Sequence, residues 1–172
     1  MEILIVVDMQ NDFIDGALGT EEAKNIVPNV IEKIKGFQGK VFFTKDTHEE
    51  TYLSTLEGKN LPVKHCILGT FGWEFPEEIA CLVKEEPIHK PTFGSKDLME
   101  QLKKADQEEP IERIVLVGLC TDICVISNAM LCKAFFPEVP ILVDASCCAG
   151  VTPESHKRAL EAMKVCQIEI LE

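Results

Sequence analysis

The residue of this chain best suited to chemistry is Cys124. It is the next-to-last residue of the segment 114–125, in which an apolar run is followed by Gly118 and then by the expected start of a helix. Unpaired backbone amides and the positive end of the helix dipole favour a thiolate in a first helical turn, and the thiolate is the nucleophilic form of cysteine. Cys124 is therefore a candidate nucleophile, although most free cysteines are buried and inert.

Two further residues have the chemistry to assist this thiol. Asp8 follows the uninterrupted apolar run 3–7, and a buried carboxylate there could take the thiol proton and deliver it to a leaving group. Lys90 ends another apolar run just before Pro91, which breaks strand pairing. A cation beside Cys124 would hold its thiolate. Taken alone, Asp8 could equally be a turn cap and Lys90 a surface charge.

A second constellation has the composition of a metal site. Asp46 and His48 are two positions apart, which puts both side chains on one face of an extended segment. His65 follows, and Glu57 lies in the intervening loop. Nitrogen and oxygen ligands without a clear thiolate favour Zn²⁺, with Mn²⁺ or Fe²⁺ as alternatives. We therefore predict a divalent metal ion, although a lone histidine is more often an ordinary polar residue.

Short apolar runs that alternate with helix-period segments must position these groups. The predicted strands are 3–7, 41–44, 87–89, 114–117, 140–143 and 167–171, and the predicted helices are about 22–37, 76–83, 95–105, 122–136 and a segment after Pro153. Strand and helix alternate throughout, which predicts an α/β fold, a three-layer α/β/α sandwich with a six-stranded, mostly parallel sheet. Ligands bind beyond the carboxyl ends of such strands, where Asp8, Asp46, Lys90, Cys124 and Asp144 are expected.

Composition limits the possible partners. The 172 residues are 46% hydrophobic and 27% charged, which fits a single domain over residues 1–172. The formal net charge of −12 argues against a nucleic-acid partner, and no apolar stretch is long enough for a membrane span. The eight cysteines are scattered along the sequence, and we recognise no signal peptide. Both observations predict a cytoplasmic protein with reduced thiols.

Three separated motifs together resemble a known family. Residues 8–13 (DMQNDF), Lys90-Pro91 and residues 118–125 (GLCTDICV) are similar, in this order, to motifs of the isochorismatase-like cysteine hydrolase superfamily. The resemblance spans nearly the whole chain and implies a catalytic triad of Asp8, Lys90 and Cys124. It also implies a cis peptide between Leu119 and Cys120, with the backbone amides of Cys120 and Cys124 forming an oxyanion hole.

The metal constellation resembles that of the nicotinamidase branch of this superfamily. By that resemblance Asp46, His48 and His65 are direct ligands, and Glu57 matches a position that acts through a water in one subgroup. The resemblance implies a metal-dependent amidohydrolase that converts nicotinamide to nicotinate and ammonia through a thioester, with activity on pyrazinamide.

The substrate walls depart from the pattern of that branch. Pro62 stands where the branch commonly places an aromatic residue, so Phe13, Trp73 and Leu119 are the expected substrate contacts. Another aromatic amide is therefore an alternative substrate, and a non-catalytic ligand-binding protein on the same fold is a second alternative. The family resemblance and an apolar segment at residues 135–137 predict a homo-oligomer.

Overall fold

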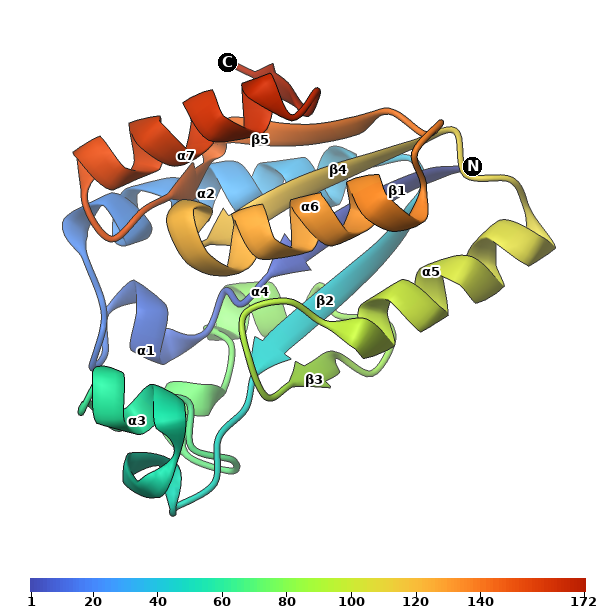
Figure 1. Ribbon diagram of the computed structural model, residues 1–172. Helices are drawn as coiled ribbons and strands as arrows, with labels where there is room; N and C mark the ends of the chain where they lie inside the picture. Colours follow the sequence, from blue (N-terminus) through green and yellow to red (C-terminus); the bar gives the residue numbers. More distant parts are fainter.

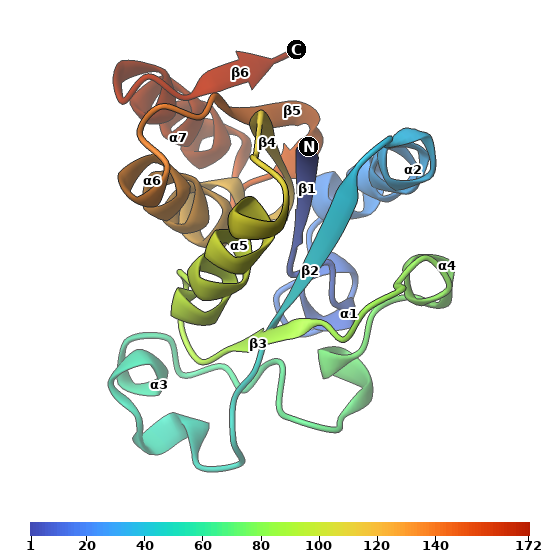
Figure 2. The same cartoon turned by 90° about the vertical axis from the view of Figure 1, so that its right-hand side faces the viewer.

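A single parallel sheet with helices on both faces forms the core of the protein. The computed structural model describes residues 1–172. The sheet order is β3-β2-β1-β4-β5-β6, and every pairing is parallel (Figures 1 and 2). The strands are β1 (Glu2–Val7), β2 (Lys40–Asp46), β3 (Ile88–Lys90), β4 (Arg113–Leu119), β5 (Ile141–Ala149) and β6 (Glu169–Leu171). The predicted α/β class and six-stranded parallel sheet are confirmed.

The alternation of side chains along β1 divides the core into two layers. Ile3, Ile5 and Val7 pack on one face, which α5 (Lys96–Glu108), α6 (Ile126–Phe135) and α7 (Pro153–Val165) cover. Leu4 and Val6 pack on the other face, which α1 (Asn11–Ile14), α2 (Glu21–Gly36) and α4 (Glu77–Ala80) cover. Successive strand residues point to opposite faces, so a strand that is apolar at every position needs helices on both sides.

The long helices begin directly after capping residues. The side-chain oxygens of Thr20, Ser95 and Thr152 accept hydrogen bonds from backbone amides of the first turns of α2, α5 and α7. Each cap satisfies an amide that has no partner within its helix. The N-terminal ends of these helices could therefore be predicted to within one residue.

Several segments differ from the sequence-based expectation. The segment expected to be helical over 76–83 has an α-helix only at Glu77–Ala80, and Cys124 lies in a π-helical turn, Thr121–Val125, that precedes α6. The predicted strand 140–143 is longer in the structure, because residues 144–149 continue β5, in which Cys148 pairs with Gly118 after a register shift. The short helix α3 (Leu56–Asn60) was not anticipated and lies beyond the end of β2 (Figure 2).

The topology brings the carboxyl ends of four strands to one edge. The chain runs outward from β1 to β2 and β3 on one side, and from β4 to β5 and β6 on the other. This reversal between β1 and β4 is the switch point at which ligands bind in open parallel sheets. Asp8, Asp46, Lys90 and Cys124 all lie at or just beyond this edge. None of the helices has the length and apolar character needed to cross a membrane.

Candidate active site

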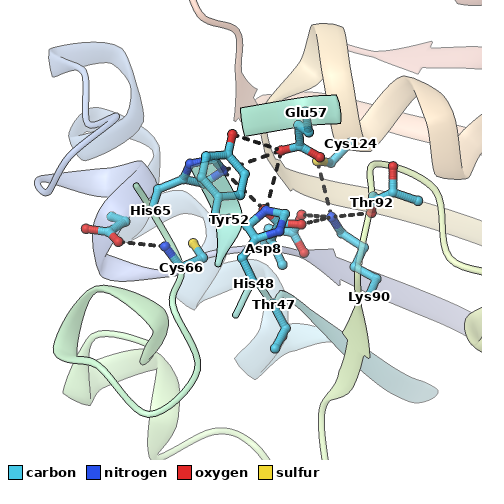
Figure 3. A network of polar contacts seen from close by, with 12 residues as sticks. Asp8, Thr47, His48, Tyr52, Glu57, His65, Cys66, Lys90, Thr92 and Cys124 are labelled. Carbon is cyan, nitrogen blue, oxygen red and sulfur yellow. Dashed lines mark hydrogen bonds and ion pairs between the residues drawn. The ribbon is translucent and has the colours of Figure 1, made fainter. Parts of the chain in front are cut away.

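Lys90 is the central residue of the site. It is the last residue of β3 and its side chain is fully buried. Its Nζ lies 2.6 Å from Asp8 Oδ2, 3.1 Å from Asp46 Oδ1 and 3.3 Å from Cys124 Sγ (Figure 3). Burial opposes the charged form, but Asp8, Cys124 and Asp46 outweigh it and hold the pKa of Lys90 well above its ordinary value. The cation that was expected beside the thiol is therefore in place.

Asp8 occupies a conformation suited to a proton carrier. It directly follows β1 with φ +47°, in the left-handed region, which aspartate tolerates better than most residues. Thr44 Oγ1 donates a 2.6 Å hydrogen bond to Asp8 Oδ1, whereas Oδ2 contacts Lys90 as an ion pair without hydrogen-bond geometry. Burial raises the pKa of Asp8, with Lys90 opposing the shift. A raised pKa favours proton uptake from a thiol.

Cys124 is buried, and its surroundings favour the neutral thiol. Burial raises the pKa of the Cys124 thiol well above its ordinary value, although the nearby Lys90 ammonium lowers it. Desolvation of Cys124 thus opposes the thiolate that the helix start was expected to favour. Cys124 needs a base to remove its proton, and Asp8 contacts the same ammonium as the sulfur does.

The turn before Cys124 contains the backbone geometry that the family resemblance implied. The peptide bond between Leu119 and Cys120 is cis, which confirms that expectation. The Cys120 carbonyl accepts from the amides of Ile123 and Val125, while the Cys120 amide donates no hydrogen bond within the protein. Thr121 Oγ1 lies 2.8 Å from His156 Nδ1, which ties this turn to α7. Burial raises the pKa of the Cys120 thiol to about 12. The thiol beside the Lys90 ammonium is that of Cys124, at 3.3 Å.

The four candidate metal ligands converge on one another beside Lys90, and Figure 3 shows three of them, His48, Glu57 and His65. Asp46 Oδ2 lies 2.9 Å from His48 Nε2 and 3.4 Å from His65 Nε2. Glu57 Oε1 on α3 lies 3.4 Å from His48 Nε2 and 3.8 Å from His65 Nε2. Ligands of a tetrahedral zinc ion at about 2.0–2.1 Å are roughly 3.3 Å apart, so these separations fit a single ion.

The surroundings of the histidines also fit a metal site. His65 Nδ1 lies 2.8 Å from the Val63 carbonyl, and this contact leaves Nε2 facing the cluster. Burial opposes a charged His65, but hydrogen bonding to Asp46 outweighs it and raises its pKa. Burial also opposes the charged form of Asp46, yet His48, His65 and Lys90 hold its pKa well below the ordinary value. A carboxylate that stays ionised is what a divalent cation requires.

The nucleophile and the ligand cluster share one small cavity. Its volume is about 40 Å³, and its lining includes Cys124, Asp46 and His65 together with the apolar side chains of Phe13, Phe93 and Ile123. Phe13 is the predicted wall that the structure brings here, with its ring 5.6 Å from the His65 ring. The cavity can hold only a small part of a substrate next to the sulfur.

The comparison with protein families decides the assignment. The model of the isochorismatase domain matches residues 2–172. The chain belongs to the isochorismatase family. The resemblance of its three motifs is thus confirmed, and the relatives place it with the nicotinamidase branch of amide-hydrolysing enzymes.

Several relatives are similar to this protein over nearly its whole length. A nicotinamidase of Schizosaccharomyces pombe is 26% identical, covering 98% of this chain and 91% of its own. A pyrazinamidase of Pyrococcus horikoshii, solved in complex with zinc, is 29% identical with a TM-score of 0.80, covering 99% and 98%. A probable inactive nicotinamidase of Arabidopsis thaliana is 29% identical, covering 94% and 87%. Activity must therefore be argued from the residues of this chain.

Two of the expected substrate contacts, Trp73 and Leu119, lie outside the cavity beside Cys124. The Trp73 ring packs on Lys45 Nζ at 3.6 Å, and its Nε1 donates to Thr47 Oγ1 at 2.9 Å. Leu119 is fully buried in the core. Neither lines the cavity beside Cys124. The contacts with Lys45 and Thr47 hold the Trp73 ring outside the cavity. The structure therefore does not support the expectation that Trp73 and Leu119 contact the substrate.

Sequence reasoning missed the roles of three residues in the first family motif. The Gln10 side chain hydrogen-bonds both backbone groups of Asp46 and the Trp73 carbonyl. Asn11 Nδ2 donates to the Phe71 carbonyl, and Asp12 Oδ2 accepts from the Cys66 amide next to His65. The motif thus ties the metal-site loop to β1. Consecutive polar residues after an apolar strand were the available signal.

Proposed function

We propose that this protein is a metal-dependent nicotinamidase with Cys124 as its nucleophile. The position of Asp46 carries the proposal, because one carboxylate contacts both halves of the site. Its Oδ1 lies 3.1 Å from Lys90 Nζ, and its Oδ2 lies 2.9 Å from His48 Nε2. An ion held by this cluster is therefore adjacent to the Lys90–Cys124 pair, as a reaction on an amide attached to a metal-binding ring requires. The similar pyrazinamidase of Pyrococcus horikoshii was solved in complex with zinc, which supports a metal-dependent activity.

The ligand set would hold the ion through Asp46, His48 and His65, with Glu57 bound directly or through a water. When bound, a divalent ion would bind the pyridine nitrogen and withdraw electrons from the ring. Phe13 packs beside His65 and would contact one face of the ring. Because the cavity joins these groups to Cys124, a ring held there presents its carboxamide to the sulfur.

The attack begins with a proton transfer. The Cys124 thiol is neutral at rest, so Asp8 takes its proton as the sulfur attacks the carboxamide carbon. Lys90 stays charged and stabilises the developing thiolate from 3.3 Å. The carboxamide oxygen becomes an oxyanion, which the backbone amides of Cys120 and Cys124 would stabilise.

Collapse of this adduct releases ammonia. Protonated Asp8 delivers its proton to the amide nitrogen, and the carbon–nitrogen bond breaks to leave a thioester on Cys124. Asp8 then takes a proton from water, and the resulting hydroxide attacks the thioester carbon. The product leaves as nicotinic acid, which gives its carboxyl proton to solvent and becomes nicotinate, and the sulfur regains its proton from Asp8. In each step Asp8 accepts or donates the proton, and it does so while buried beside the Lys90 ammonium.

Ammonia release from nicotinamide by the purified zinc-loaded protein tests the proposal. We expect turnover of nicotinamide and pyrazinamide, loss of turnover in Cys124→Ala, and retention in the matched control Cys81→Ala, whose thiol is exposed and distant from the site. Removal of the metal by a chelator should abolish turnover, and added Zn²⁺ should restore it. Full turnover by Cys124→Ala, or turnover of neither amide, would refute the proposal.

A further inference from the structure

The cavity beside Cys124 is too small for an aromatic ring in its present state. Its volume is about 40 Å³, whereas an apolar cavity that holds benzene measures about 150 Å³. A second cavity of about 580 Å³ opens next to it. Substrate must therefore enter through the side chains that separate the two spaces.

Four residues line both cavities and form this partition. They are Glu57, Leu61, Phe93 and Ile123. Glu57 belongs to the ligand cluster and Ile123 to the turn of the nucleophile, so both are already held in place. Leu61 and Phe93 are the mobile candidates, because they are 38% and 42% exposed and belong to neither buried core cluster.

The backbone of Phe93 is fixed relative to the nucleophile. Lys90 Nζ donates to the Thr92 carbonyl at 3.1 Å, and Asn128 Nδ2 donates to the Phe93 carbonyl at 3.0 Å. The same amide nitrogen of Asn128 donates to the Cys124 carbonyl at 2.8 Å. Asn128 is fully buried, so it joins the two segments rigidly. Because the Phe93 backbone is fixed in this way, the partition can open next to Phe93 only by rotation of the Phe93 side chain.

We propose that Phe93 is the residue that determines specificity for the aromatic ring. This inference depends on the proposed function. The Phe93 ring rotates outward to admit the substrate and then packs on its ring, opposite the buried Phe13. It takes the place of an aromatic contact that neither Pro62 nor Trp73 makes in this chain. The site therefore selects amides of a single aromatic ring, since a Phe93 ring packed on the substrate ring would occupy the space that a second fused ring needs.

Steady-state kinetics on the zinc-loaded protein test this role. We expect Phe93→Ala to raise KM for nicotinamide roughly tenfold while kcat changes by less than about threefold, because aromatic packing is lost but the reacting groups are not. Phe93→Tyr should restore KM. The matched control Phe71→Ala, whose side chain is 82% exposed and lines neither cavity, should behave as the unmodified protein.

Two further measurements separate a ring contact from a general loss of structure. Calorimetric titration with nicotinate should show weaker binding to Phe93→Ala by a similar factor, with the Zn²⁺ affinity unchanged. The ratio of kcat/KM for quinoline-3-carboxamide to that for nicotinamide should rise in Phe93→Ala. An unchanged KM and ratio in an active Phe93→Ala would overturn the inference and leave the proposed function standing. Absence of nicotinamide turnover in the unmodified protein would overturn both.

Discussion

The side-chain amide of Gln10 pairs with the backbone of Asp46 as a neighbouring strand would. Gln10 Nε2 donates to the Asp46 carbonyl at 2.9 Å, and Gln10 Oε1 accepts from the Asp46 amide at 2.7 Å. Both residues are buried. Asp46 in turn contacts Lys90 and both histidines of the ligand cluster. A residue that touches no reacting atom therefore fixes the carboxylate that joins the two halves of the site.

Replacement of Gln10 should weaken metal binding. In Gln10→Leu the Asp46 backbone groups lose buried partners, which costs about 1–3 kcal/mol of unfolding free energy. The Asp46 carboxylate also loses its orientation, and we expect Zn²⁺ affinity to fall by about 10–100-fold. Competition with a chromogenic chelator measures the affinity. Gln38→Leu is the matched control, since the exposed Gln38 bonds only the nearby Gly36 carbonyl. Equal affinities in the two variants would refute this role.

Removal of the Lys90 charge should abolish turnover and destabilise the fold. Lys90→Met leaves Asp8 and Asp46 as buried carboxylates without their cation, so we expect a loss of about 3–5 kcal/mol in unfolding free energy. Urea denaturation of the metal-free protein measures this loss. The double variant Asp8→Asn/Lys90→Met should recover part of the stability but no activity. Lys103→Met removes an exposed cation and should change little.

Asp144 should make the stability depend on pH. Burial opposes its charged form, but hydrogen bonds from Lys33 and Ser146 outweigh burial and hold the pKa of Asp144 below its ordinary value. Because the folded-state pKa is depressed, the carboxylate stabilises the fold fully above the ordinary pKa of about 4. This contribution is lost as the pH falls through the folded-state pKa.

The comparison of Asp144→Asn with the unmodified protein tests this dependence. We expect the variant to unfold at lower urea concentration at pH 7, by about 1 kcal/mol or less, because the ion pair is partly solvated. The two proteins should converge in stability as the pH falls below about 4. A difference that stayed constant from pH 7 to pH 3 would show that the charge of Asp144 is not its cause.

Zinc should stabilise the protein through His65. A ligand that binds only the folded state raises the unfolding temperature, so added Zn²⁺ should raise that of the unmodified protein and not that of His65→Ala. His89→Ala is the matched control, because His89 is exposed and packs on Trp73 outside the cavity. If His65→Ala responded to Zn²⁺ as fully as the control, the ion would bind elsewhere.

Local patterns in the sequence were sufficient to predict the sheet, whereas the grouping of Asp8, Lys90 and Cys124 as a triad came from the resemblance of three motifs to a known family. Apolar runs such as residues 3–7 must be covered on both faces, and the residue after each run lies at the ligand-binding edge. Asp8, Lys90 and Cys124 could therefore be placed together before any coordinates. The helix starts at Thr20, Ser95 and Thr152 were equally readable, since the cap and first turn are contiguous.

What could not be predicted depends on contacts between distant segments. The raised pKa of the Cys124 thiol follows from desolvation by the completed core, and the spacing of residues in the sequence does not reveal it. Trp73 resembles a substrate wall in the sequence, but Lys45 and Thr47 hold its ring outside the cavity. Phe93 gave no signal because its role depends on Asn128, thirty-five positions away, which fixes its backbone beside the nucleophile.

The central claim is that Cys124 forms a thioester with the acyl group of nicotinamide. Acid quenching of the zinc-loaded protein within its first turnover, followed by mass spectrometry of its peptides, tests this claim most directly. We predict a nicotinoyl group on the peptide that contains Cys124, and neither this adduct nor nicotinate formation in Cys124→Ala. Nicotinate formation by Cys124→Ala at the rate of the unmodified protein, with no adduct in either, would contradict the account.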